Sequence, residues 1–234
     1  MPIRVMAAAV ATAAGLALGS GGLALSANAA PTSGVQLTGT QLLAALLPAS
    51  DFPAGYKLEK SSVYDSGSHL LTAPAKYHLA TQSCASFAKN FGQRGFGETA
   101  VAANAYIKSG SGLSARLFGQ QAYQFKTSAA AAGFYSALRA IMHRCPRFAL
   151  AGIPASAKVT TKIIDGPSIG GHKTFEIDLT GTISGFRLGF KLVFTVASQD
   201  LFLTGNLGVL TTPPASPSPR TTMLRLITRV ASFR

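Results

Sequence analysis

The chain has 234 residues, of which 47% are hydrophobic and only 12% are charged, and its formal net charge is +13. The hydrophobic content excludes an intrinsically disordered protein, and the length suits one domain that buries a core of its own. The positive balance either keeps the protein soluble or draws it to anionic surfaces. The sequence lacks the dense basic run with interleaved aromatic residues that is typical of nucleic-acid binding, so no nucleic-acid partner is expected.

The N-terminus has the pattern of a secretory signal peptide. Arg4 is followed by a long, uncharged run of small and apolar residues, which ends at an A-x-A cleavage site at 27–29. We therefore expect removal of residues 1–29, a flexible mature N-terminus over 30–39, and a secreted, extracellular protein, either free or associated with the cell envelope. An uncleaved membrane anchor is the alternative. No later segment is long and apolar enough to cross a bilayer.

The first predicted elements are a helix, a strand and a second helix. The first helix has Thr40 as its cap and a leucine stripe, and Pro48 ends it. The stretch 56–67 is predicted as a strand. The second helix surrounds Cys84 and ends at Gly92, and its apolar positions follow the spacing i, i+4, i+7 and i+11. These positions are Ala80, Cys84, Phe87 and Phe91.

A hairpin and a third helix follow. Apolar residues alternate over 98–108 and again over 113–125, and the glycine and serine residues at 109–112 form the turn between the two strands. The third helix begins after Thr127 or Ser128 as its cap. Its buried stripe is predicted to consist of Phe134, Leu138, Ile141 and Cys145.

The second half of the chain has the clearest strand pattern. Apolar residues alternate over 174–183 and 186–197, and a further strand over 201–210 follows a turn. Such strands form an antiparallel meander with one dry face, which the helices can cover. The predicted fold class is therefore α+β, with an antiparallel sheet of about five to six strands and helices packed on one face. Residues 40–234 form this single domain.

The C-terminal part is predicted as a Pro/Ser linker over 213–220 and a helix. One face of this helix is basic and the other is apolar. We expect the apolar face to dock on the sheet, and a helix lying on a membrane surface is the alternative. The basic face has Arg225, Arg229 and Ser232, and the apolar face has Met223, Ile227 and Val230.

Two cysteines, Cys84 and Cys145, lie in the exported part of the chain. In an oxidising compartment, a pair without a third cysteine favours a single disulfide over a redox pair or metal ligands. The histidines show no metal-ligand spacing with either cysteine, and no cofactor motif is present, so neither a metal nor a cofactor is expected. The histidines are His69, His78, His143 and His172.

The segment 166–170 fits the G-x-S-x-G pattern of a nucleophilic serine. A nucleophile elbow needs a following helix, but Ser168 is followed by the strongest strand pattern of the chain. The histidine after it, His172, has no acidic residue between it and the serine, so the hydrolase order is absent. Pro167 and the neighbouring glycines indicate an ordinary turn. The protein is predicted not to be an enzyme, and a secreted serine hydrolase using Ser168 is the less favoured alternative.

Two other patterns contain residue types that are found in chemical sites. Glu176 and Asp178 are two residues apart on the expected solvent face of a strand, whereas a glycosidase needs its carboxylates across a cleft. The glycine-rich stretch 109–112 lacks the strand, helix and lysine context of a phosphate-binding loop. Neither pattern predicts a catalytic site.

The block QAYQFKTSAAAAGFYSALRAIMHRCPRF resembles a segment of the PknH-like extracellular sensor domains of actinobacteria. LLPASDFPAGY, CASF, GPSIGG and MLRLITRV occur around it in the same order as in that family. The resemblance covers about 40–234. It implies an antiparallel sheet packed with helices around a cleft, which binds a ligand either as part of a receptor kinase or in a free-standing secreted protein.

The resulting hypothesis is a secreted, non-enzymatic, sensor-like domain. It would capture a small amphiphilic or anionic envelope molecule, such as a lipid-like ligand, in a groove between sheet and helices. Arg139, Arg144 and Arg147 are candidates for an anionic contact, but solvated charges at a helix end are the favoured interpretation. The alternative function is a basic protein that attaches to an anionic cell-surface polymer.

Overall fold

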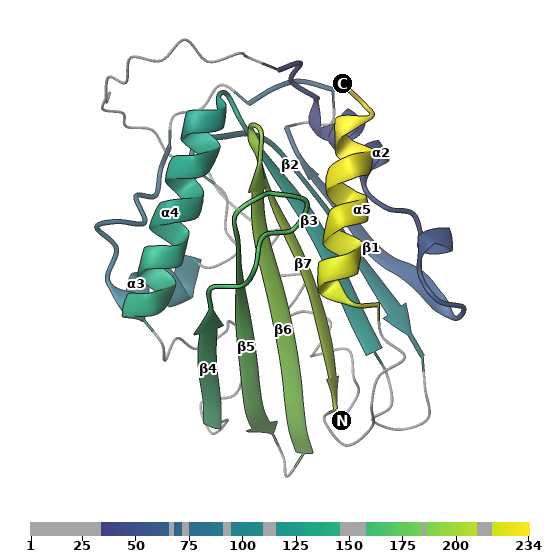
Figure 1. Ribbon diagram of the computed structural model, residues 1–234, viewed down its shortest axis with the longest axis vertical. Coiled ribbons are helices and arrows are strands. Elements are labelled where there is room, and N and C mark those ends of the chain that lie inside the picture. Colours follow the sequence, from purple (N-terminus) through teal and green to yellow (C-terminus); the bar gives the residue numbers. More distant parts are fainter. Residues whose placement is uncertain are drawn as a thin grey trace.

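The computed structural model describes residues 34–65, 68–71, 75–90, 95–109, 116–145, 158–183, 186–209 and 217–234. Its centre is a seven-stranded antiparallel sheet in the order β1-β2-β3-β7-β6-β5-β4 (Figure 1). The strands are β1 (Tyr56–Tyr64), β2 (Glu98–Lys108), β3 (Arg116–Phe125), β4 (Lys158–Ile164), β5 (Thr174–Ile183), β6 (Phe186–Ala197) and β7 (Asp200–Val209). The helices are α2 (Gly39–Ala45), a 3-10 turn (Ala49–Asp51), α3 (Cys84–Asn90), α4 (Ser128–Arg144) and α5 (Pro219–Ala231).

The α+β class and the antiparallel sheet are confirmed, with one strand more than the upper end of the expected range. The additional strand is β4, whose sequence KVTTKII has no regular alternation of apolar and polar residues. Among the described strands, β4 lies at the edge of the sheet and pairs with β5. An edge strand needs less apolar patterning because fewer of its side chains are buried between neighbours.

Helices cover both faces of the sheet, which corrects the expectation of a single covered face. One hydrophobic cluster combines the sheet with α2 and α5, and a second combines it with α3 and α4. We call the second side the α4 face; it carries the odd-numbered residues of β2, β3, β5 and β7 and the even-numbered residues of β6. The opposite side is the α5 face. In Figure 1, both α4 and α5 lie beside the upper half of the strands, and the lower half extends past them.

The α4 face is held by a long helix and an aromatic layer. Thr127 caps α4 by accepting a hydrogen bond from the Ala130 backbone N–H, as one of the two predicted caps. Beneath the helix, the rings of Phe175 and Phe194 stack at 4.7 Å, and Tyr135 of α4 meets Phe175 edge-on. Three of the four residues of the predicted α4 stripe are buried, and the fourth is half-buried.

The α5 face is covered by the C-terminal helix, so the prediction of a docked helix is confirmed. Met223, Leu226 and Val230 are fully buried against the sheet. The helix begins at Pro219, a residue suited to the first helical position, and the expected linker therefore ends at Ser218. Residues 213–216 of that linker lie outside the described residues.

The N-terminal end of α2 differs from the prediction. The cap is Thr38 rather than Thr40, and it forms a reciprocal capping box with Gln41. The backbone N–H and C=O of Leu37 both bind the side-chain amide of Gln124 on β3. Part of the stretch expected to be a flexible N-terminus is therefore tied to the sheet. The predicted signal peptide lies outside the described residues.

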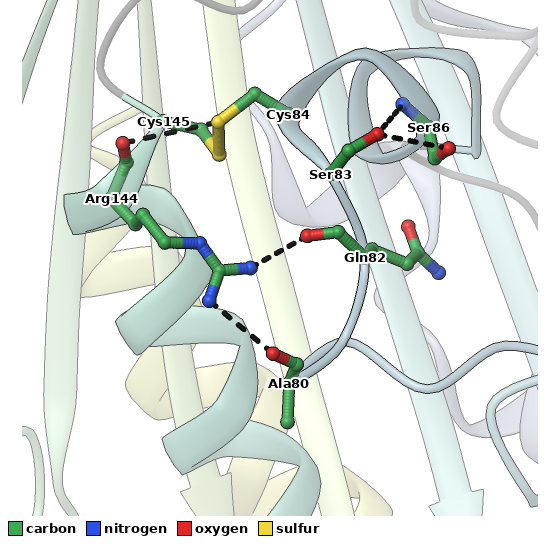
Figure 2. The surroundings of a disulfide bond; sticks show 7 residues. All are labelled: Ala80, Gln82, Ser83, Cys84, Ser86, Arg144 and Cys145. Atoms are coloured by element: carbon green, nitrogen blue, oxygen red, sulfur yellow. Dashed lines mark hydrogen bonds between the residues drawn. A yellow bond between two sulfur atoms is a disulfide. The ribbon is translucent and has the colours of Figure 1, made fainter.

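The disulfide between Cys84 and Cys145 is confirmed, with the two Cα atoms 5.4 Å apart. α3 begins only at Cys84, so Ala80 is not part of that helix, and Cys84 is exposed rather than buried. Cys145 follows α4 as its cap residue and is buried. The bridge thus joins the start of α3 to the end of α4 (Figure 2). Phe91 and Gly92 lie outside the described residues.

The G-x-S-x-G segment forms a turn between β4 and β5, as the sequence predicted. Gly170 and Gly171 have backbone φ angles of 57° and 82°, which residues other than glycine rarely adopt. Ile169 and His172 exchange two backbone hydrogen bonds across this turn. The chain then continues into β5, so Ser168 does not lie on a strand-to-helix elbow.

Candidate ligand-binding groove

A groove crosses the α4 face of the sheet, in the part that α3 and α4 do not cover. It encloses about 70 Å³, and no residue of either helix lines it. Its floor is one row of residues that are aligned across neighbouring strands. The row runs from Lys60 on β1 through Ala105, Gly119 and Gly205 to Leu192 on β6.

The floor is deep at its centre, where Ala105 and Gly119 are small and the flanking rows are large. One wall is formed by Leu117, Leu207 and Phe190, which are register partners in the row below. The other wall includes Gln121 and Leu203 in the row above. Most of the lining is therefore apolar, as in protein sites that bind small molecules.

Gly205 is needed at its place in the floor. A Cβ atom on this residue would lie 2.6 Å from Cδ2 of Leu192 and 3.0 Å from the backbone oxygen of Lys191. The glycine therefore lets the Leu192 side chain lean over β7 and close the inner end of the groove. Any side chain at this position would push that end wall away or fill the floor.

A second cavity, of about 50 Å³, lies beneath α4 next to the groove. Gln121 and Leu203 line both cavities, so these two residues separate the open groove from the covered space. The other residues that line the second cavity are apolar or aromatic: Leu79, Phe87, Phe96, Tyr123, Phe134, Leu138, Phe194 and Leu201.

Gln121 is the unusual polar residue of this region. β3 has three buried glutamines, and the two on the α5 face are hydrogen-bonded: Gln120 donates to the Leu47 carbonyl at 2.6 Å and Gln124 to the Leu37 carbonyl at 2.7 Å. Gln121 faces the opposite way and is only 6% exposed. Within the described part of the chain, its side-chain amide has no hydrogen-bond partner, but its nitrogen and oxygen are not among the buried side-chain atoms that lack a partner. The amide is therefore in contact with solvent in the groove.

The arginines considered for an anionic contact are used elsewhere. Arg139 forms a two-pronged ion pair with Asp165, and this hydrogen bonding lowers the pKa of the Asp165 carboxyl. Figure 2 shows Arg144 extending to the backbone carbonyls of Ala80 and Gln82, at 3.3 and 2.7 Å. Neither residue lines the groove. Arg147 lies outside the described residues.

Glu176 does not lie on a solvent face, contrary to the prediction. It is 6% exposed and forms ion pairs with Arg220 at the start of α5 and with Lys191 on β6. Asp178 pairs with the same lysine at 3.1 Å. Both carboxylates are thus neutralised by neighbouring cations on the α5 face, away from the groove. Among the described residues, no three His, Cys, Asp or Glu side chains form a possible metal site.

The sequence contains a signal for the groove in the small residues of two strands. Ala103, Ala105 and Gly119 occupy consecutive inward positions of two predicted strands, where leucine, valine or phenylalanine would fill a core. Small residues at such positions indicate a close approach or an open space. Gln121 interrupts the same apolar alternation.

No helix among the described residues is long and apolar enough to span a bilayer.

No protein-family model matches the chain, and no curated protein matches it either. Its structure is similar to the crystal structure of the extracellular domain of PknH from Mycobacterium tuberculosis. The TM-score is 0.51, with 13% sequence identity over 84% of this chain and 97% of that chain. An uncharacterized protein from Mycobacterium smegmatis gives a TM-score of 0.40, with 12% identity over 82% of this chain and 96% of that chain.

At such low identity, the comparison concerns the fold. It agrees with the order of sequence motifs that pointed to the same family, and it extends over nearly all of the PknH domain. This chain therefore has the fold of the PknH-like extracellular sensor domains.

Proposed function

We propose that this protein is a secreted, non-enzymatic binding domain that captures a small amphiphilic or anionic molecule of the cell envelope in the groove of the α4 face. The observation that carries the proposal is the pair of small neighbouring residues Ala105 and Gly119, which lie between apolar walls on an otherwise closely packed sheet. Protein sheets that only form a core fill such positions with larger side chains. The open space at these two residues therefore supports a bound ligand.

The charge of the groove supports an amphiphile over a purely apolar molecule. Lys60 is exposed at the outer end, on the edge strand β1, whereas the inner end is closed by Leu192. A molecule with an apolar body and an acidic or polar head matches this polarity, because the body loses water contact while the head stays near the cation. The fold of a kinase sensor domain fits a binding role without catalysis.

The direct test fills the floor of the groove. The probe is 1-anilinonaphthalene-8-sulfonate, an anionic amphiphile whose fluorescence rises on transfer from water. We expect Ala105→Phe to weaken its binding at least about tenfold, because the new ring occupies the space of the ligand. Thr180→Phe is the matched control; Thr180 is exposed on the α5 face, and its replacement should leave the probe affinity unchanged.

Both variants are first compared with the unmodified protein by thermal unfolding, so that a loss of binding is not a loss of folding. Equal probe binding by folded Ala105→Phe and Thr180→Phe would disprove the groove as the binding site. Native mass spectrometry of the protein from its own host would then show whether any small molecule is bound elsewhere.

A further inference from the structure

The lower half of the α5 face is strongly basic. In Figure 1, α5 lies beside the upper half of the strands, and the strands continue below it. Below the start of α5, this face carries five cationic side chains, which we call the basic surface: Lys108 on β2, Arg116 on β3, Lys162 on β4, and Arg187 and Lys191 on β6. The groove lies on the opposite face of the sheet.

Few carboxylates oppose the basic surface. Asp178 and Glu176 lie beside it, and both form ion pairs with Lys191. Lys162 and Arg187 form no ion pair in the described part of the chain. All eight acidic residues of the sequence lie in that part, so the remaining segments contain no acidic side chain that could neutralise these cations. The basic surface therefore has an excess of positive charge.

Two of the cations have side-chain stems that pack over glycine residues. A Cβ atom on Gly208 of β7 would lie 3.0 Å from Cδ and 3.3 Å from Nη1 of Arg116, so this side chain lies across β7. A Cβ atom on Gly55 would lie 3.3 Å from Cε of Lys108. The packing restricts both side chains before a partner arrives, which reduces the conformational entropy that they lose on binding.

The basic surface lacks the groups that recognise nucleic-acid bases or lipid tails. Stacking of bases needs exposed aromatic rings, and a membrane-surface site needs apolar side chains that enter the lipid. None of the exposed large hydrophobic residues in the described ranges lies on a strand from β2 to β7. The residues between the cations are small or polar: Thr160, Thr180, Thr182, Gly189, Asn206 and Gly208. A partner of this surface is therefore recognised by its negative charge.

The cations are spread over the surface and do not surround a single point. Lys162 and Lys191 lie two strands apart in one register row, which corresponds to about 10 Å. Arg187 and Lys191 lie four residues apart on β6, which corresponds to about 13 Å. A small anion can contact only one or two of these cations. A chain with a charge on every repeat can contact several of them and displaces its own counterions, so it binds more tightly than its monomer.

We propose that the basic surface binds a linear extracellular polymer that carries phosphate groups along its backbone. The polymer lies across the lower strands from Lys108 and Arg116 towards Lys162, and its phosphate groups pair with the ammonium and guanidinium groups. The inference goes beyond the proposed function, because it assigns a second partner to the opposite face of the sheet. The same molecule can hold a small ligand in the groove while it is attached to the polymer.

The test measures the binding of end-labelled linear polyphosphate to the full secreted protein by fluorescence anisotropy at several salt concentrations. With about four to five phosphate contacts, log K should fall with log[NaCl] at a slope of about −3. The double variant Lys162→Gln, Arg187→Gln should bind about tenfold or more weakly near 0.1 M salt, and its slope should be shallower by about 1.4. The pair Lys108→Gln, Arg187→Gln serves as a second variant if the first is poorly folded.

The matched control removes the same net charge elsewhere. Lys89 on α3 and Lys126 after the end of β3 are exposed and lie away from the basic surface. Lys89→Gln, Lys126→Gln should weaken binding by less than about twofold, because distant exposed charges are screened. Thermal unfolding first shows that both double variants are folded. Equal weakening in the two, or binding that does not depend on salt, would overturn the assignment to this surface.

Two further measurements address the partner class and the independence of the two sites. Vesicles of phosphatidylcholine and phosphatidylglycerol test an anionic membrane as the partner. Tighter binding to these vesicles than to polyphosphate, lost in Lys162→Gln, Arg187→Gln, would overturn the polymer. This variant should keep the affinity for 1-anilinonaphthalene-8-sulfonate. If it loses both probes together, a separate binding surface on the α5 face is wrong, whereas loss of polyphosphate alone supports it.

Discussion

Asp200 and Glu176 are both buried in the sheet, but their surroundings shift their pKa values in opposite directions. Burial raises the pKa of Asp200 to about 6, although Arg234 lies 2.7 Å away and opposes the shift. Burial also acts to raise the pKa of Glu176, but hydrogen bonds from Arg220 and Lys191 outweigh it and lower the pKa. One arginine does not compensate for the loss of water around Asp200, whereas two cations do so for Glu176.

The raised pKa of Asp200 predicts a pH dependence of stability. The contribution of Asp200 to the free energy of unfolding is fully present below its unfolded pKa near 3.8. This contribution is lost as the pH rises through the folded pKa of about 6. The difference of about two pKa units corresponds to roughly 3 kcal/mol in the free energy of unfolding. Urea unfolding at pH 4.5, 5.5 and 7 should show this decline in the unmodified protein and not in Asp200→Asn. The same decline in both proteins would contradict the assignment to Asp200.

Glu176 affects the free energy of unfolding in a lower pH range than Asp200 does. Because its folded pKa lies below the ordinary value of 4.5, its contribution is present above that value and is lost only as pH falls through the folded pKa. The two carboxylates therefore oppose each other only at acidic pH. Between pH 5 and 7, the decline caused by Asp200 should be visible without the effect of Glu176.

At the scale of single elements, α5 packs on the sheet with one side and binds the segment after α2 with the other. Leu226 is fully buried on its apolar side, and Arg229 on the other side donates to the backbone carbonyl of Leu46 at 3.2 Å. Arg225 forms an ion pair with Asp51. The basic residues that suggested a membrane-surface helix thus have partners within the protein.

Leucines on this helix provide a matched pair for testing its packing. Leu226→Ala should lower the free energy of unfolding by about 2 to 5 kcal/mol, because it leaves a cavity against the sheet. Leu224→Ala removes the same atoms from a side chain that is 46% exposed, and it should change stability by no more than about 0.5 kcal/mol. Similar losses in chemical denaturation of the two variants would mean that the helix does not dock as described.

At the scale of the whole molecule, the disulfide closes the region that covers the α4 face. It joins residues 61 positions apart and encloses the hairpin β2–β3 together with α3 and α4. Phe87 of α3 and Phe134 of α4 both line the covered cavity beside the groove. The bridge therefore holds together the two helices that cover this half of the α4 face.

Removing the bridge should destabilise the fold without abolishing it. The chain-entropy model gives about 4 kcal/mol for a loop of this length, and in a domain of this size that amounts to a fall in melting temperature of roughly 8 to 16 °C. The double variant Cys84→Ser, Cys145→Ser avoids a free thiol, and differential scanning calorimetry measures the change. An unchanged melting temperature would show that the packing of α3 and α4 alone fixes this region.

Much of the fold could be predicted from local patterns because those patterns depend on nearby residues. The cap at Thr127, the strand alternation of β5 and β6 and the two-glycine turn are set by contacts within a few residues. The cap of α2 was misplaced by two residues because Thr38 and Thr40 are both suitable caps. The capping box with Gln41 favours the first of them.

By itself, the sequence determined the helices, most of the strands, the disulfide pairing and the turn that excludes a nucleophile elbow at Ser168. The tertiary structure decided that β3 lies beside β7 and that helices cover both faces, because these contacts join segments distant in the chain. The tertiary structure also decided what the glutamine side chains of β3 contact. Identical side chains one residue apart point to opposite faces, so Gln120 meets a carbonyl while Gln121 lines an open groove.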